Sequence, residues 1–236
     1  MNASRFKTKN DEIAGLFDSI AGHYDFLNHF LSFGIDKLWR KKIIRMISKE
    51  HPDSILDIAT GTSDLAIAAA TKIQGVQITG IDISEKMLGI AKEKIREKHL
   101  EDRITLQKKS AESMDFADNN FDNVMVAFGV RNFEDLNKGL QQMLRVVKPG
   151  RKIFILEFSK PQGFIKPFFN FYFRYLLPFI GKLISGNSNA YRYLHRSAIS
   201  FPDRKYFTDI LTQQGFTKTY CHYLSSGIAT IYVGIK

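Results

Sequence analysis

Residues 54–72 read SILDIATGTSDLAIAAATK, a sequence that predicts a strand, a turn and a helix in direct succession. Its first six residues form a short apolar run, which is typical of a buried strand. A turn of Thr, Gly and Ser follows, and the alanine-rich remainder is typical of a helix. A strand that passes through a tight turn into a helix is the repeating unit of a parallel sheet with helical crossovers.

The same alternation of strand and helix continues along the chain. Further strands are predicted over residues 76–82, 103–107, 122–127 and 152–158. Helices are predicted after Ser84, which suits an N-cap, and over residues 136–147, where Pro149 and Gly150 end the helix. Near-continuous apolar strands favour a parallel sheet with helices on both faces, and right-handed crossovers make it doubly wound.

The C-terminal part departs from this rhythm. A helix is predicted over residues 203–214, followed by strands over 216–224 and 228–235. Only Ser225, Ser226 and Gly227 join these two strands, and so short a connection requires an antiparallel hairpin. The predicted fold is therefore α/β, a doubly wound and mostly parallel sheet that ends in an antiparallel hairpin.

Composition narrows the class of protein. The 236 residues are 44% hydrophobic and 25% charged, as in globular proteins, and the single Cys221 excludes an intramolecular disulfide framework. Without an apolar leader or a run of 18 apolar residues, we expect a cytoplasmic protein with no membrane-spanning helix. The net charge of +10 divides into +3 for residues 1–52, −1 for 53–158 and +8 for 159–236. A basic, aromatic last third is compatible with nucleic acid, a membrane surface or an acidic partner.

The loop after the first strand predicts a ligand site, because ligands on such sheets bind at the carboxyl ends of the strands. Gly61 allows backbone to approach a ligand closely, but the later glycines of the NAD fingerprint are absent. Asp64 begins the next helix and would repel a phosphate there. Asp57, at the strand end, instead suits a ligand that carries an ammonium or sulfonium charge.

Residues after the next two strands extend this site. Asp82 ends the second strand, where a carboxylate accepts hydrogen bonds from both ribose hydroxyls of a nucleoside. Ser110 and Ala111 follow the third strand and are placed to edge an adenine. The set describes a nucleoside with a cationic amino-acid tail, which is S-adenosylmethionine. A turn glycine or an acid after a strand is common for structural reasons, so the prediction depends on the combination.

The chain resembles the ubiquinone/menaquinone biosynthesis C-methyltransferases over nearly its whole length. The motifs that carry the resemblance are Phe17-Asp18-Ser19-Ile20-Ala21, Leu56-Asp57-Ile58-Ala59-Thr60-Gly61-Thr62, Phe128-Gly129-Val130-Arg131-Asn132, Leu156-Glu157-Phe158-Ser159-Lys160-Pro161 and Tyr191-x-Tyr193-Leu194-x-x-Ser197. The resemblance implies the class I S-adenosylmethionine-dependent methyltransferase fold. It also implies C-methylation of a polyprenylated quinol, with demethylmenaquinol as the first choice of substrate.

By matched position, the resemblance implies that Thr62, Asp82, Ser110 and Ala111 bind the cofactor. The chain departs from the family's pattern at Ser63, where the family usually has Gly. It has Ala127 where some members have a Ser that contacts the cofactor, so we do not assign that contact here.

The resemblance and the chemistry together point to Arg131 and Asn132 as catalytic residues. A quinol ring carbon becomes nucleophilic when the neighbouring hydroxyl loses its proton, which a phenol pKa near ~10 makes unfavourable at pH 7. A fixed cation such as Arg131 stabilises the developing oxyanion, and Asn132 positions the ring oxygen or a water. The alternative is that Arg131 only pairs with a carboxylate such as Glu134.

Three tyrosines are candidates for contact with the substrate or for a lid, namely Tyr24, Tyr191 and Tyr193. Tyr24 belongs to an amphipathic N-terminal segment that either closes over the cofactor or only packs there. No His, Asp or Glu cluster has the spacing of metal ligands, so no metal is expected.

Residues 164–184 are rich in Phe, with three basic residues and no acid. Pro167 and Pro178 break any continuous helix, so this segment forms part of a greasy pocket, docks on a membrane or is simply core. We divide one domain, residues 1–236, into an N-terminal helical lid (1–52), a cofactor-binding core (53–158), an aromatic and basic insert that covers the substrate (159–202), and a helix and hairpin that complete the sheet (203–236).

Alternative functions remain open. The same chemistry fits the 2-polyprenyl-6-methoxy-benzoquinol precursor of ubiquinone. An RNA or protein methyltransferase, or a non-catalytic cofactor-binding subunit of a membrane-associated quinone-synthesis complex, are the other classes. Because the excess charge lies in the aromatic last third, it favours contact with an anionic membrane surface over nucleic acid. We expect that charge to gather on one face around the quinol pocket, and we leave a homo-oligomer open.

Overall fold

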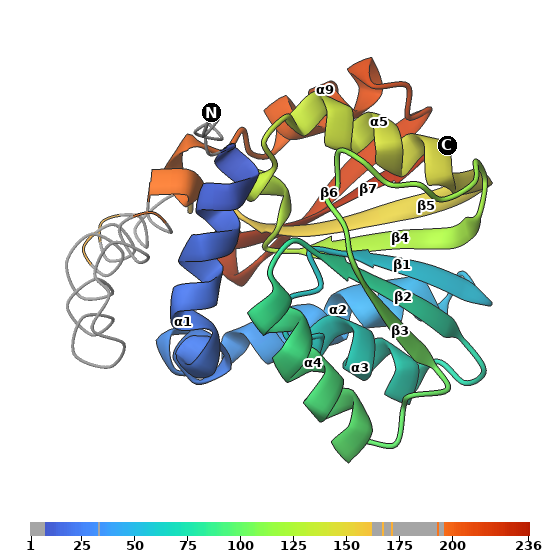
Figure 1. Cartoon of the computed structure of the whole chain (residues 1–236). Helices are drawn as coiled ribbons and strands as arrows, with labels where there is room; N and C mark the ends of the chain where they lie inside the picture. The colour runs from blue at the N-terminus through green and yellow to red at the C-terminus, as the bar shows by residue number, and fades with distance from the viewer. Residues whose placement is uncertain (1–7, 33, 162–166, 168–170, 172–192, 194–195) are drawn as a thin grey trace, which may run out of the picture.

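The computed structural model describes residues 8–32, 34–161, 167, 171, 193 and 196–236. Its elements alternate as the sequence predicts, and Figure 1 shows their arrangement. They are α1 (Lys9–Leu31), α2 (Ile35–Ser48), β1 (Ser54–Ile58), α3 (Asp64–Lys72), β2 (Gln77–Asp82), α4 (Glu85–Glu97), β3 (Ile104–Lys108), β4 (Phe121–Ala127), the 3₁₀ helix η1 (Val130–Asn132), α5 (Leu136–Val146), β5 (Val147–Phe158), α9 (Lys205–Gln213), β6 (Lys218–Leu224), η3 (Ser225–Gly227) and β7 (Ala229–Ile235).

Seven strands form one sheet in the order β3-β2-β1-β4-β5-β7-β6. The first five are parallel, and β7 runs antiparallel to both of its neighbours, β5 and β6. This arrangement confirms the predicted parallel sheet and the C-terminal hairpin. The strand order reverses between β1 and β4, and a reversal of this kind leaves a crevice at the carboxyl ends of the two strands.

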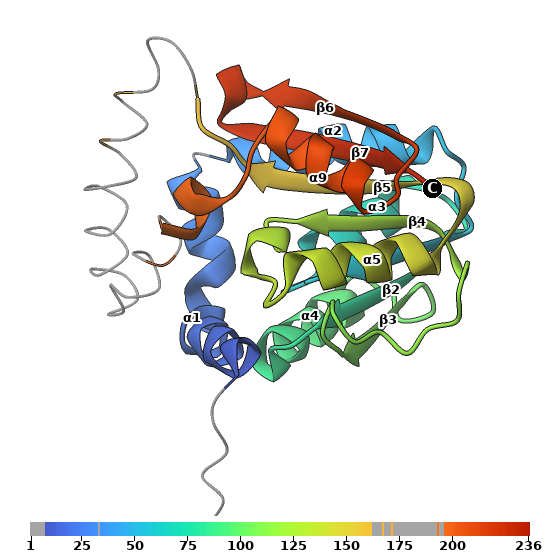
Figure 2. The ribbon, with the colours of Figure 1, turned by 90° about the horizontal axis from the view of Figure 1, so that it is seen from above.

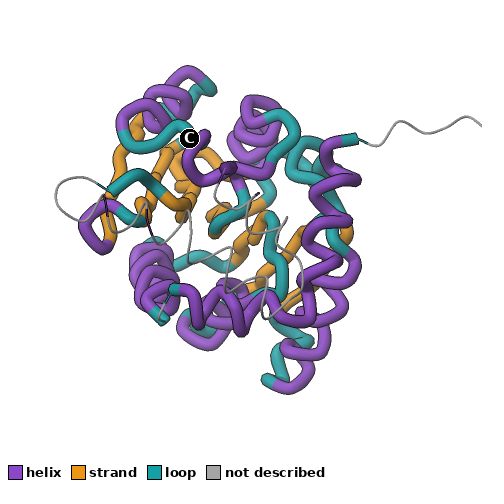
Figure 3. The backbone as a smooth tube through the Cα atoms, turned by 90° about the vertical axis from the view of Figure 1, so that its left-hand side faces the viewer, coloured by secondary structure: helices purple, strands orange, loops and turns teal. Residues whose placement is uncertain are grey.

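Helices cover both faces of the sheet, as Figures 2 and 3 show. On one face, α2 and α3 bury apolar residues against the strands; among them are Trp39, Ile43, Ile47, Leu65 and Ala69. On the other face, α5 and α9 do the same with Leu140, Met143, Phe207 and Leu211. These residues recur at spacings of three and four, as a helix with one buried face requires.

One boundary differs from the prediction. Helix α5 ends at Val146 and β5 begins at Val147, so Pro149 and Gly150 lie inside the strand and not before it. The pairing with β4 shifts between Phe121–Val147 and the next pair, so residues 148–151 bulge. Gly150 has a φ of 74°, and its N–H donates to the carbonyl of Lys236 at 3.1 Å. The helix thus ends three residues before Pro149, and the Pro-Gly pair lies in a bulge around which pairing with neighbouring strands continues.

Helix α1 runs across the carboxyl edge of the parallel strands (Figure 1). It is attached to the β4–α5 connection by the Lys9 ammonium, which donates to the carbonyl of Phe133 at 2.6 Å. It is also attached to the start of α4, where Ser84 Oγ donates to the Asp18 carboxylate. The segment 164–184 lies outside the described residues, apart from Pro167 and Phe171.

Candidate active site

A cavity lies at the carboxyl edge of the sheet, over the reversal of strand order, with about 610 Å³ of empty space when its open mouth is included. Ligands of open α/β sheets bind at such a reversal. Four predicted residues line it, namely Gly61, Asp82, Ala111 and Asn132. Helix α1 closes one side with Asn10, Ile13 and Phe17.

The loop after β1 holds an unusual backbone conformation. Ala59, Gly61 and Ser63 all have positive φ, at 52°, 56° and 64°. Phe128, in the loop after β4, also has a positive φ of 58°. Such residues cost about 1–3 kcal/mol each when they are not glycine, and they persist only where the surroundings hold them. Three of the nine such residues other than glycine in the described part of the chain, Ala59, Ser63 and Phe128, belong to the two loops at this cavity.

Asp82 connects the loop after β1 to the start of α4. Its Oδ2 accepts from the Gly61 N–H at 2.8 Å, and its Oδ1 accepts from the Ser84 N–H at 2.9 Å. Burial raises the pKa of its carboxyl, although these backbone hydrogen bonds oppose the rise. A carboxylate has about four acceptor positions, so Asp82 keeps acceptor capacity for a ligand in the cavity.

Asp57 lies underneath this loop and is only 1% exposed. Its Oδ2 accepts a hydrogen bond from the Thr60 hydroxyl at 2.6 Å. Burial raises the pKa of Asp57 from 3.8 to about 7; the Thr60 hydrogen bond opposes this, and the charge of Asp82 adds to it. Two neighbouring acids whose pKa values are raised favour a positively charged ligand, which would stabilise their ionised forms.

Ser110 and Ala111 lie beside the cavity, and Ala111 lines it. The Ser110 hydroxyl donates to Glu112 Oε2, and the Asn10 amide approaches it at 3.5 Å. Glu112 is buried and also lines the cavity, and its Oε1 accepts from the Glu134 N–H at 2.7 Å. Glu112 therefore anchors the loop that holds both predicted residues.

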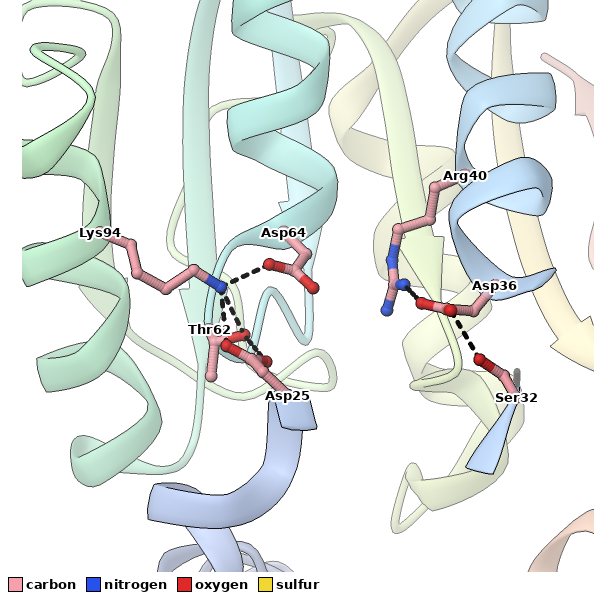
Figure 4. A network of polar contacts seen from close by, with 7 residues as sticks. All are labelled: Asp25, Ser32, Asp36, Arg40, Thr62, Asp64 and Lys94. Atoms are coloured by element: carbon pink, nitrogen blue, oxygen red, sulfur yellow. Dashed lines mark hydrogen bonds and ion pairs between the residues drawn. The ribbon is translucent and has the colours of Figure 1, made fainter. Parts of the chain in front are cut away.

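Thr62 belongs to a polar network that joins three elements (Figure 4). Its hydroxyl donates to Asp25 Oδ1 of α1 at 2.6 Å. The Lys94 ammonium of α4 contacts Asp25 Oδ2 at 2.8 Å, Thr62 Oγ1 at 3.3 Å and the Asp64 carboxylate. Lys94 thus holds α1 against the loop after β1, which contains Thr62 and begins the sequence-predicted cofactor site. Nothing in the sequence around Lys94 separates it from an ordinary exposed helix residue, so it was missed.

Arg131 forms a buried ion pair with Glu157, at the end of β5. Their side chains are 3% and 0% exposed, and Nη1 lies 2.7 Å from Glu157 Oε1. Arg131 Nη1 also donates to the carbonyl of Phe128 at 2.6 Å, and Nε donates to the Ser197 hydroxyl at 3.2 Å. The sequence left open that Arg131 pairs with a carboxylate such as Glu134; Arg131 does pair with a carboxylate, but that carboxylate is Glu157.

Asn132 lines the cavity, and Tyr193, from the C-terminal part of the chain, contacts Asn132. The Tyr193 hydroxyl donates to Asn132 Oδ1 at 3.1 Å. Burial raises the pKa of Tyr193, as does the charge of Glu157, while Arg131 lowers it. Tyr24 lies in α1 with its side chain outside the described part, and Tyr191 also lies outside it. The catalytic and substrate assignments of these residues stay predictions.

Two searches of the described residues are negative. No group of three or more His, Cys, Asp or Glu side chains in that part of the chain is arranged to hold a metal ion. Within the same residues, no helix combines the length and the apolar character needed to cross a bilayer.

Comparison with known proteins agrees with this geometry. A solved S-adenosylmethionine-dependent methyltransferase from Aquifex aeolicus has a TM-score of 0.60 and 16% identity, over 81% of this chain and 88% of its own. Together with the sheet order, it defines the class I methyltransferase fold. The model of the ubiE/COQ5 methyltransferase family matches residues 5–236, and the chain belongs to that family. It is therefore a methyltransferase, and the resemblance seen in its motifs is confirmed.

Two relatives are similar over nearly their whole length. The demethylmenaquinone methyltransferase of Porphyromonas gingivalis is 43% identical over 230 residues, which are 97% of this chain and 94% of the relative. The ubiquinone/menaquinone biosynthesis C-methyltransferase UbiE of Geotalea daltonii is 44% identical over 230 residues, 97% of each chain.

The raised pKa of Asp57 predicts how stability varies with pH. Between about pH 4 and pH 7 the folded protein binds more protons than the unfolded chain, so this group's contribution to the free energy of unfolding falls as pH rises. Asp57→Asn removes that dependence. Relative to wild type, its unfolding free energy in urea should therefore increase from about pH 5 to about pH 8, by at most ~1.4 kcal/mol per unit. The exposed control Asp102→Asn should show no such trend, and a constant difference for Asp57→Asn would contradict the assignment.

The Lys94 network predicts how firmly α1 is held. Lys94→Met leaves Asp25 and Asp64 near each other without their shared cation. Partly exposed ion pairs contribute up to about 1 kcal/mol to stability. Their loss should therefore speed up hydrogen exchange of the α1 amides by as much as about fivefold. Lys92→Met, exposed on the same helix, is the matched control and should leave α1 unchanged. Equal exchange in both variants would show that Lys94 does not hold α1.

Proposed function

We propose that the protein transfers the methyl group of S-adenosylmethionine to a ring carbon of demethylmenaquinol, giving menaquinol. The observation that carries this proposal is the cavity at the strand reversal, with the carboxylates of Asp82 and Glu112 in its lining. The name of the 43% identical relative supports the choice of quinol. The relative named for both quinones keeps the benzoquinol precursor of ubiquinone as the second candidate.

The residues on the cofactor side fit S-adenosylmethionine. The acceptor capacity that Asp82 keeps suits the ribose hydroxyls. Ile83, Met87 and Ala111 give an apolar border for an adenine ring. Asp57 and Asp82 together supply negative potential for the sulfonium and ammonium charges. When bound, the cofactor supplies an electrophilic methyl group.

Thr62 and Ser110 would bind the cofactor by exchanging partners. Their hydroxyls now donate to Asp25 and Glu112. The Thr62 contact joins the cofactor loop to α1, so cofactor entry and the position of α1 are coupled. This coupling supports the assignment of α1 as a lid.

On the opposite side, Asn132 and Tyr193 are suited to contact the quinol oxygen. Asn132 lies on the cavity wall, and the Tyr193 hydroxyl already bonds to it. Phe17 and Phe133 border the same cavity and offer apolar surface to an aromatic ring. The Asn132 amide would orient the ring hydroxyl while its proton passes to a water.

On this side of the cavity, Arg131 would position Asn132 and would not itself contact the quinol. Its guanidinium is held by Glu157 and by the Phe128 carbonyl, so it fixes the backbone that presents Asn132. Its positive charge also lies close enough to Tyr193 to lower the pKa of that phenol. We therefore propose Arg131 as a positioning residue that stabilises negative charge near the quinol oxygen through Asn132 and Tyr193.

The direct test is incubation with S-adenosylmethionine and reduced demethylmenaquinone, followed by mass spectrometry of the quinone. A gain of one methylene is expected, and a parallel reaction with the benzoquinol precursor distinguishes the two candidates. Asp82→Asn should weaken cofactor binding, measured by calorimetry, by about a hundredfold, because the loss of a buried charged acceptor costs about 2–3 kcal/mol. Cofactor binding without product from either quinol would refute the proposed enzyme activity.

A pair of variants separates the structural and catalytic roles of Arg131. Arg131→Met leaves the Glu157 carboxylate unpaired in the core, which should reduce the free energy of unfolding by about 3–5 kcal/mol. Arg131→Met combined with Glu157→Met removes both charges and should recover most of that loss. If Arg131 supports catalysis, the stable double variant still has a kcat lowered by about a hundredfold, with cofactor KM little changed. A double variant with normal kcat would limit the pair to folding.

A further inference from the structure

The outward face of α2 is strongly basic, although residues 1–52 as a whole carry a net charge of only +3. Lys37, Lys41, Lys42 and Arg45 are all exposed on this helix, at spacings that bring them to one side. The opposite side of α2 is buried in the core through Trp39 and its apolar neighbours. Residues 1–52 total only +3, because the acids of α1 offset this basic helix.

Helix α3 extends this basic surface across a groove of about 1040 Å³. The groove is lined by cations from both helices, which are Lys37, Arg40, Lys41, Arg45 and Lys72. Among the described residues that line it, Asp64 is the one acid, and Asp64 is paired with Lys94. The surface therefore presents a concentrated positive potential to a large anionic partner.

An apolar side chain lies within this basic surface. Leu38 is 65% exposed, one helical turn before Lys41 and Lys42. An exposed leucine among lysines and arginines is the pattern of a helix that lies in a lipid interface, where the apolar group enters and the cations contact head groups. Nucleic acid would reward the cations but would gain little from this leucine.

The basic surface begins next to the cavity. Arg40, at its inner end, lies with its guanidinium carbon 5.8 Å from the centroid of the Phe128 ring, and Phe128 lines the cavity. Asp64, in the groove, shares Lys94 with Thr62 of the cofactor loop. A bilayer in contact with this surface would thus lie near the end of the molecule at which a lipid-borne substrate must enter.

We propose that this α2 basic face, defined as Lys37, Leu38, Lys41, Lys42 and Arg45 with Lys72 of α3, docks the protein on an anionic lipid bilayer. The inference deepens the proposed function, on which it rests for the reason to approach a bilayer. It assigns the contact to α2, a segment distinct from the basic aromatic insert that the sequence suggested. Each cation near an anionic surface contributes about fivefold in affinity, the equivalent of ~1 kcal/mol.

The test is co-sedimentation of the full chain with phosphatidylcholine vesicles, with and without phosphatidylglycerol. We expect binding that requires phosphatidylglycerol and weakens as salt rises. The triple variant Lys37→Gln/Lys41→Gln/Arg45→Gln should bind about a hundredfold more weakly. Leu38→Ser should lose about tenfold while keeping the salt dependence of wild type.

A matched control removes equal charge from another helix end. Lys92→Gln/Arg96→Gln/Lys98→Gln changes three exposed cations of the α4 region and should retain nearly all binding. Equal losses in the two triple variants would reduce the effect to net charge and overturn the assigned face. Absence of binding by wild type, or stronger binding to a DNA duplex than to the anionic vesicles, would also overturn it.

Catalysis is measured separately, with quinol dispersed in detergent. Methylation there combined with no vesicle binding would refute the docking face and leave the proposed function intact. Vesicle binding that depends on the α2 basic face, with no methylation of either quinol, would refute the proposed function and leave the docking face intact.

Discussion

The carboxylate of Asp82 is the interaction on which the site depends. It joins the Gly61 N–H of the first loop to the Ser84 N–H at the start of α4, from the end of the strand between them. Moving either loop would remove one of these two donors, at a cost of about 1.5–3 kcal/mol for a hydrogen bond to a charged group. The positive φ angles of Ala59 and Ser63 persist against this fixed point, and the cavity takes its shape from them.

The two sides of the cavity differ in electrostatic design. On the side proposed for the cofactor, burial and the charge of Asp82 raise the pKa of Asp57, while burial and the charge of Asp18 raise that of Asp82, so a cationic ligand is favoured. On the opposite side, the Arg131 charge is balanced by Glu157 inside the core. The first side gains from a positive ligand, whereas the second holds a preorganised cation whose field costs no rearrangement when negative charge develops nearby.

The parts that sequence predicted are those that depend on neighbouring residues. The strand–turn–helix unit, the Ser84 N-cap and the terminal hairpin all follow from local pattern, and the structure confirms them. The parts that it missed join distant residues. Glu157 lies 26 positions from Arg131, and Lys94 lies 69 from Asp25, so composition and spacing favour no particular partner. Glu134 is nearer to Arg131 in the sequence than Glu157 is. In a sheet, however, side chains from strands far apart in the sequence meet, so nearness along the chain does not identify the partner.

The ion pairs near the cavity differ in how easily water reaches them. The Arg131–Glu157 pair is excluded from solvent, whereas the Lys94–Asp25 pair, which holds α1, is partly exposed. Arg131 and Glu157 are almost fully excluded from solvent, so parting them would strand two charges in the core. Lys94 and Asp25 are 26% and 28% exposed, so water would replace each partner if α1 moved as the proposed lid. In the proposed function, the weaker pair would lie where the cofactor enters and leaves, and the stronger pair where the reacting groups need a constant geometry.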